Sequence, residues 1–113
     1  MVFYETRELH KKVALRTRWY QGKYSEIKDA ILKVASEMGY EVIDINDTYQ
    51  EMLLEGTNTI SIKISSYGRY EHGVDFSLSS NLPFDFGMGK RVIVKWYDNL
   101  GKYCKFKGVS LHP

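Results

Sequence analysis

The sequence contains one cysteine, two prolines and no long apolar run. A single cysteine cannot close an internal disulfide, which argues against the class of small secreted domains that disulfides hold together. No apolar run approaches the ~20 residues that a membrane-spanning helix needs, and the first residues lack the apolar stretch of a signal peptide. We therefore expect a cytoplasmic protein that has no membrane partner.

Internal repeats and low-complexity segments are also absent, and no proline- or serine-rich linker divides the chain. A hydrophobic content of 43% beside 27% charged residues is typical of a folded protein rather than a disordered one. The 113 residues suit one domain with its own core. We expect a single domain over residues 1–113, in which residues 1–10 form either an edge strand or a loose arm.

An amphipathic pattern predicts one helix over residues 25–38. Ser25 is suited to its N-cap, and Gly39 to the left-handed residue that ends many helices. A helix with one apolar face needs a flat apolar surface to cover. The apolar residues recur at helical spacing and form one stripe: Ile27, Ala30, Ile31, Val34, Ala35 and Met38.

Alternation of apolar and polar residues predicts strands on both sides of this helix. Residues 13–20 alternate before it, with Val13, Leu15 and Trp19 expected to face the helix. Short turns join most of the later strands and favour antiparallel neighbours. The expected fold class is α+β, with the single helix packed on a curved, mainly antiparallel sheet of about six to seven strands in the order β-α-β-β-β-β-β-β. The six later strands are expected near residues 40–46, 49–55, 60–65, 74–79, 91–97 and 102–109.

Residues that could bind a metal or carry catalysis are few and scattered. The three histidines, His10, His72 and His112, show no metal-ligand spacing. Cys104 alternates with Phe106 in the last expected strand, on the side expected to face the core. Residues 87–90 (Gly-Met-Gly-Lys) lack the first glycine and the Ser or Thr of a phosphate-binding P-loop, and we expect a strand after them rather than a helix. We expect no cofactor, no metal site and no enzymatic activity.

The charges are sorted along the chain, although the formal net charge is only +2. Residues 1–23 carry a net charge of +4, residues 24–80 of −6, and residues 81–113 of +4. The basic ends and the acidic middle therefore predict a surface with regions of opposite charge.

Strand alternation predicts that basic and tyrosine side chains share one sheet face, if the first strand lies near the last two. Cations that neutralise phosphates and flat rings that stack on bases suit single-stranded RNA or DNA. A solvated sheet face is the plainer interpretation, since tyrosine favours strands without any ligand and a pI near 8.6 is modest for a nucleic-acid binder. The candidate nucleic-acid-binding residues are Arg16, Arg18, Tyr20, Arg91, Lys95, Tyr97, Tyr103, Lys105 and Lys107.

The alternative function is a protein–protein interaction module, in the simplest case a homodimer. Aromatic residues make up 14% of the chain, and Tyr and Trp are favoured at interface hot spots. The basic and acidic stretches could also pair head to tail between two copies. Residues 67–73 form a candidate partner-binding loop that is rich in Tyr and Gly. Its candidate contact residues are Tyr67, Arg69, Tyr70 and His72.

Overall fold

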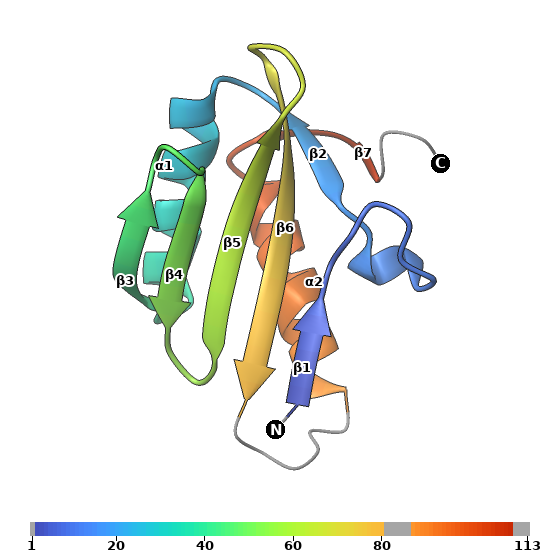
Figure 1. Cartoon of the computed structure of the whole chain (residues 1–113), viewed down its shortest axis with the longest axis vertical. Coiled ribbons are helices and arrows are strands. Elements are labelled where there is room, and N and C mark those ends of the chain that lie inside the picture. Colours follow the sequence, from blue (N-terminus) through green and yellow to red (C-terminus); the bar gives the residue numbers. More distant parts are fainter. Residues whose placement is uncertain (1, 81–86, 110–113) are drawn as a thin grey trace.

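A seven-stranded sheet with two helices on one of its faces makes up the protein (Figure 1). The computed structural model describes residues 2–80 and 87–109. Within these residues the radius of gyration is 13.2 Å, so the α+β fold expected from the sequence is confirmed as one compact domain. The elements are, in chain order, β1 (Val2–Glu5), the 3₁₀ turn η1 (Val13–Leu15), β2 (Arg18–Gln21), α1 (Tyr24–Glu37), β3 (Glu41–Asn46), β4 (Glu51–Glu55), β5 (Thr59–Ser66), β6 (Glu71–Ser80), α2 (Met88–Leu100) and β7 (Lys105–Val109).

The strands follow the order β3-β4-β5-β6-β2-β7, and each neighbouring pair is antiparallel. β1 and β2 share one side of the long strand β6, where β1 pairs with Ser77–Ser80 and β2 with Glu71–Val74. The first ten residues therefore contribute a strand, which was one of the two structures expected for them. Among the described residues, no helix is long and apolar enough to cross a membrane.

The core lies between the helices and one face of the sheet. α1 buries Ile27, Ile31 and Val34 of the expected apolar stripe, and β5 and β6 bury alternate residues on the same side of the sheet. The helix begins at Tyr24, one residue before the expected start, and its N-cap is Lys23 and not Ser25. The backbone N–H of Lys23 donates to Glu26 Oε1 over 2.9 Å, which is one half of a capping box.

The expected strand over residues 91–97 is wrong, because this segment lies within the helix α2. Its β-branched and aromatic residues alternate as they would in a strand, yet the buried positions follow helical spacing. Residues 88–90 are the first residues of this helix, and Gly87 stands at its N-cap with φ +81°. The buried residues of α2 are Gly89, Ile93, Trp96, Tyr97 and Leu100.

The expected orientation of the first long strand is also wrong. Residues 13–15 form η1 rather than strand, and only Leu15 of its apolar residues is buried. In β2, Tyr20 faces the helices and is 1% exposed, whereas Trp19 lies on the opposite face against Gly73. Gly73 has no side chain, so the sheet can bury the large indole on the face that the helices leave open.

Candidate functional site

The nine candidate nucleic-acid-binding residues do not share a sheet face. They are distributed over the segment before β2 (Arg16), β2 (Arg18 and Tyr20), the helix α2 (Arg91, Lys95 and Tyr97), the turn after α2 (Tyr103) and β7 (Lys105 and Lys107). The side chain of Lys107 lies outside the described part of the chain, as does His112. The expectation that the first strand lies beside the last is confirmed, because β2 pairs with β7. The prediction of a flat basic sheet face is wrong, because it needed residues 91–97 to form a strand and they lie in the helix α2.

Two of the three candidate tyrosines are buried beneath the sheet. Tyr97 on α2 donates its hydroxyl to Val74 O over 2.6 Å, and Tyr20 donates to Tyr97 O over 3.2 Å. Burial raises the pKa of both phenols above the usual tyrosine value, so both keep their protons at neutral pH. Neither ring is accessible for stacking on a base.

Arg18 packs between α2 and β7 instead of projecting from an open face. Its guanidinium lies 4.7 Å from the centre of the Tyr97 ring, and its Nη1 is 3.3 Å from Asp98 Oδ1. The aromatic ring and the carboxylate both favour the positive charge in this half-buried position. Arg18 therefore acts in holding α2 against the sheet, and Asp98 neutralises its charge.

Part of the exposed remainder of the candidate set lies at one free edge of the sheet, while Arg91 and Lys95 are exposed on α2. We call this edge the basic edge and define it as β7 with the turn before it, where Tyr103, Lys105 and Phe106 are exposed. Lys33 of α1 adds a further charge, with its Nζ 4.5 Å above the Tyr103 ring. The Tyr103 hydroxyl donates to Glu37. β7 pairs only with β2 within the described residues, so its outer side has no strand partner there.

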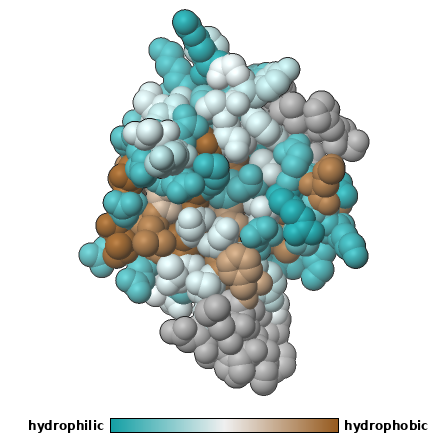
Figure 2. Space-filling view, viewed as in Figure 1, coloured by the Kyte–Doolittle hydropathy of each residue, from teal (hydrophilic) through white to brown (hydrophobic). Residues whose placement is uncertain are grey.

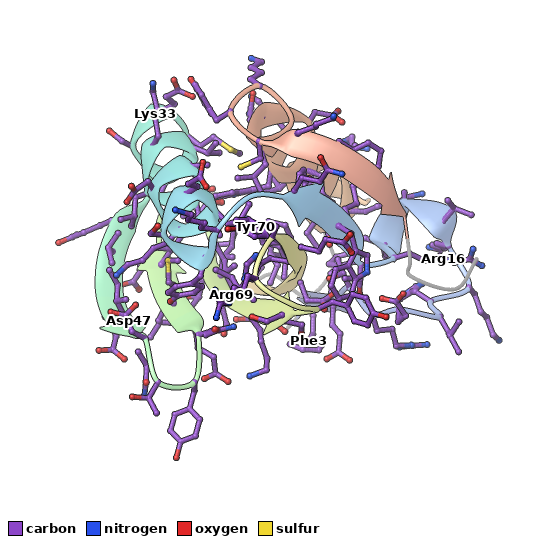
Figure 3. The ribbon with its side chains drawn as sticks, turned by 90° about the horizontal axis from the view of Figure 1, so that it is seen from above. Phe3, Arg16, Lys33, Asp47, Arg69 and Tyr70 are labelled. Carbon is purple, nitrogen blue, oxygen red and sulfur yellow. The ribbon has the colours of Figure 1, made fainter. Side chains whose placement is uncertain are left out.

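The candidate partner-binding loop is shorter than expected. The connection between β5 and β6 covers residues 67–70, where Tyr67, Arg69 and Tyr70 are exposed at the tip of the long hairpin (Figure 3). His72 belongs to β6 and is 2% exposed. Its Nδ1 donates to Gly22 O over 3.0 Å, so this histidine has a structural role at the start of α1.

A polar hollow of about 350 Å³ lies on the open face of the sheet. Asp75 is at its centre, half-buried, and its Oδ1 accepts hydrogen bonds from the hydroxyls of Thr6 (2.6 Å) and Thr17 (2.7 Å). Burial raises the pKa of this carboxyl, while the two threonine hydroxyls act in the opposite direction. The two threonines fill the gap between β1 and β2, and Tyr97 OH lies 3.2 Å from Thr6 Oγ1. The polar groups here satisfy one another and join α2 to the sheet.

The surface that the sequence did not reveal is β3, which is also an edge strand among the described residues. Residues 41–45 are all exposed, and three of them are large and apolar: Val42 (37%), Ile43 (49%) and Ile45 (36%). Leu53 of β4 extends this surface, and Figure 2 shows apolar side chains gathered over the β3–β4 side of the molecule. We call β3 with its exposed side chains the acidic edge, because Glu41 and Asp44 are its only charged residues. The apolar residues Val42, Ile43 and Ile45 predicted this strand, but not that it lies at the margin of the sheet.

Within the described residues, no group of three or more His, Cys, Asp and Glu side chains could hold a metal ion. Cys104 is half-buried, and burial raises the pKa of its thiol to about 11. The thiol is therefore protonated at neutral pH and a poor nucleophile. Phe106, which was expected inside with Cys104, is 46% exposed.

Comparisons with known proteins give no relative: no family model matches the chain, and neither a curated protein nor a solved structure matches it.

Proposed function

We propose that this protein is a non-catalytic protein–protein interaction module that binds an extended partner segment along the free edge of β3. The observation that carries the proposal is the exposure of Val42, Ile43 and Ile45 in a strand with no outer neighbour among the described residues. An exposed apolar patch on a soluble domain marks an interaction surface. The outward backbone N–H and C=O groups of an edge strand are a template for one further strand.

The side chains of β3 restrict the partner that this edge accepts. Glu41 and Asp44 favour a partner segment with basic residues, while the three apolar side chains favour a segment with apolar residues at alternate positions. A register shift between Val42 and Asp44 places a bulge in the middle of β3. Bulges and charges on edge strands limit indiscriminate pairing, so this edge favours a matched segment over a random one.

The nucleic-acid hypothesis remains a prediction, but one of the observations that favoured it no longer holds. It depended on tyrosines and cations sharing one flat face, and Tyr20 and Tyr97 are buried. Fluorescence anisotropy with labelled single-stranded RNA and DNA over a salt series tests it directly, because phosphate contacts weaken as salt rises. Binding that disappears in Lys105→Ala would restore this function.

Selection of short random peptides displayed on phage, with the immobilised protein as target, tests the proposed function. We expect the selected peptides to alternate apolar and basic residues. We expect the double variant Ile43→Ser/Ile45→Ser to lose these peptides, since it removes the apolar surface without adding charge. Val13→Ser is the matched control, because Val13 is 59% exposed and lies in η1, away from both sheet edges. Equal selection by the double variant and the wild type would contradict the proposal.

A further inference from the structure

Within the described residues β3, β7 and β1 each have an outer side without a strand partner, and the properties of β3 and β7 are complementary. We propose that the segment that binds the acidic edge β3 is the basic edge β7 of a second copy, so that the protein assembles head to tail through one continuous sheet. This inference rests on the proposed function, because it names the partner of the same edge. Strand direction, side-chain face and charge each favour this contact.

Two copies in the same orientation have the strand directions that an antiparallel contact between β3 and β7 requires. The path from β3 to β7 contains six strands, and each is antiparallel to the next, so β3 and β7 run in opposite directions. A second copy placed beside the first in the same orientation therefore brings its β3 antiparallel to β7. The joined sheet keeps its antiparallel pattern, and the helices of both copies stay on the same face.

Side-chain faces match across this contact. Val42 and Ile45 pair with Leu54 and Met52, which are buried under the helices, so both lie on the helix side of β3. Phe106 pairs with the buried Tyr20, and their ring centres are 5.8 Å apart, so Phe106 lies on the helix side of β7. Residues opposite each other in a ladder share a face. Head-to-tail pairing thus brings the half-exposed Phe106 against the half-exposed apolar side of β3.

Charges match on the other face of the same strands. Glu41 pairs with the exposed Glu55 of β4, and Lys105 pairs with the exposed Gln21 of β2, so both lie on the open side of the sheet. Asp44 pairs with the exposed Leu53 and also lies on the open side. Lys105 of one copy therefore meets the carboxylates of the next. Cross-strand pairs of opposite charge stabilise a ladder, and like charges destabilise it.

Self-pairing of either edge is disfavoured by the same charges. Two copies of β3 joined antiparallel would bring Glu41 and Asp44 of each copy together, with no basic residue in the strand to balance them. Two copies of β7 would bring their Lys105 side chains near one another in the same way. A head-to-tail contact uses a different patch on each copy, so it repeats to form an open chain or a ring. In Figure 3, Asp47, which follows β3, and Arg16, which precedes β2, lie on opposite sides of the molecule.

Sedimentation velocity at low salt over a series of protein concentrations tests the inference. We expect the mean mass of the wild type to rise past that of a dimer of the 13.2 kDa chain, and to fall when salt is added. The variants Asp44→Lys and Lys105→Glu should each remain monomeric. An equimolar mixture of the two variants should assemble again. In the mixture, the changed side chain on β3 of the Asp44→Lys variant is opposite in charge to the changed side chain on β7 of the Lys105→Glu variant, and the two unchanged edges keep their wild-type charges. Glu5→Lys and Lys11→Glu make the same charge changes away from β3 and β7 and should assemble as the wild type does.

Each outcome decides between distinct arrangements. Assembly by Lys105→Glu at wild-type strength would overturn the inference in favour of β3 pairing with itself, and a mixture that stays monomeric would overturn it as well. A wild type that is monomeric at every concentration also overturns it. In that last case the peptide selection is unaffected, so loss of the selected peptides in Ile43→Ser/Ile45→Ser would still support the proposed function on its own. Circular dichroism of every variant ensures that only folded proteins are compared.

Discussion

Gly73 is the residue that allows Trp19 to lie flat on the open face of the sheet. A Cβ at this position would be 2.9 Å from Trp19 Cε2 and Cζ2 and 3.0 Å from Thr17 Cγ2. Such distances require the indole or the strand to move, so we expect Gly73→Ala to lower the free energy of unfolding by about 1–3 kcal/mol. Urea denaturation followed by tryptophan fluorescence measures this change. Gly108→Ala is the control, because its Cβ would meet no atom within 4 Å, and we expect a change below about 0.5 kcal/mol.

Asp75 makes the stability of the protein depend on pH. Burial raises the pKa of this carboxyl in the folded state above that of the unfolded chain, so the folded state keeps the proton over a pH range in which the unfolded state has lost it. The contribution of Asp75 to the free energy of unfolding is therefore largest at low pH, and falls as pH rises through that range above 3.8. Asp75→Asn cannot titrate, while its side-chain oxygen can still accept from Thr6 and Thr17.

Denaturation of the wild type and of Asp75→Asn at several pH values tests this dependence. We expect the wild type to lose stability relative to the variant as pH rises from the ordinary Asp pKa toward neutrality. All other titrating groups are common to both proteins and cancel in the difference. A difference that is constant with pH would show that the folded and unfolded states bind the Asp75 proton equally.

At the scale of elements, buried tyrosine hydroxyls anchor α2 to the sheet, and that of Tyr97 makes the shorter hydrogen bond. Tyr97 OH donates to Val74 O of β6 and is buried, at the point where β1 ends and β2 begins. Tyr97→Phe leaves this carbonyl without its side-chain donor in a buried site, and we expect a loss of about 1–3 kcal/mol in the free energy of unfolding. Tyr49→Phe provides the comparison, because Tyr49 is 66% exposed, and it should change stability by less than about 0.5 kcal/mol. Thermal and urea unfolding should rank the two variants in the same order. Equal losses of stability in Tyr97→Phe and Tyr49→Phe would contradict this role of the Tyr97 hydroxyl.

The elements differ in how far the sequence could predict them. α1, β5 and β6 were predictable because each buries one face, so that the spacing of Ile27, Ile31 and Val34, or of Ile60, Ile62 and Ile64, reports the structure directly. α2 was mispredicted because its β-branched and aromatic residues favour strands locally, and its packing against the sheet outweighs that preference. The helical spacing of its buried residues from Gly89 to Leu100 was present in the sequence and could have indicated a helix.

The candidate site was less predictable than the fold, for a reason of geometry. A strand pattern gives alternate faces, but it does not say which strand ends up at the margin of the sheet. The position of β3 depends on pairings between strands distant in sequence, such as β2 with β6 and β2 with β7. For the same reason the local sequence does not show which of Trp19 and Tyr20 faces the helices, since this depends on Gly73 lying opposite Trp19.

At the scale of the whole molecule, folding turns the charge pattern of the sequence into two poles. The basic ends of the chain meet because β2 pairs with β7, and the acidic middle supplies β3 and β4 at the far edge of the sheet. Ion pairs neutralise only part of the acidic side, where Lys28 binds Asp47 and Lys63 binds Glu51. The small net charge of +2 therefore arises from cancellation between separated regions.

Such a molecule should bind weakly to ion-exchange media of both signs at neutral pH and low salt, because each resin meets the pole of opposite charge. Asp44→Lys should reduce retention on an anion exchanger more than Glu5→Lys does, although both add the same charge. Lys105→Glu should in turn reduce retention on a cation exchanger. Elution in a salt gradient, at a loading concentration where each protein is monomeric, gives the comparison. Equal shifts for Asp44→Lys and Glu5→Lys would mean that the net charge governs retention, and that β3 is not a pole of its own.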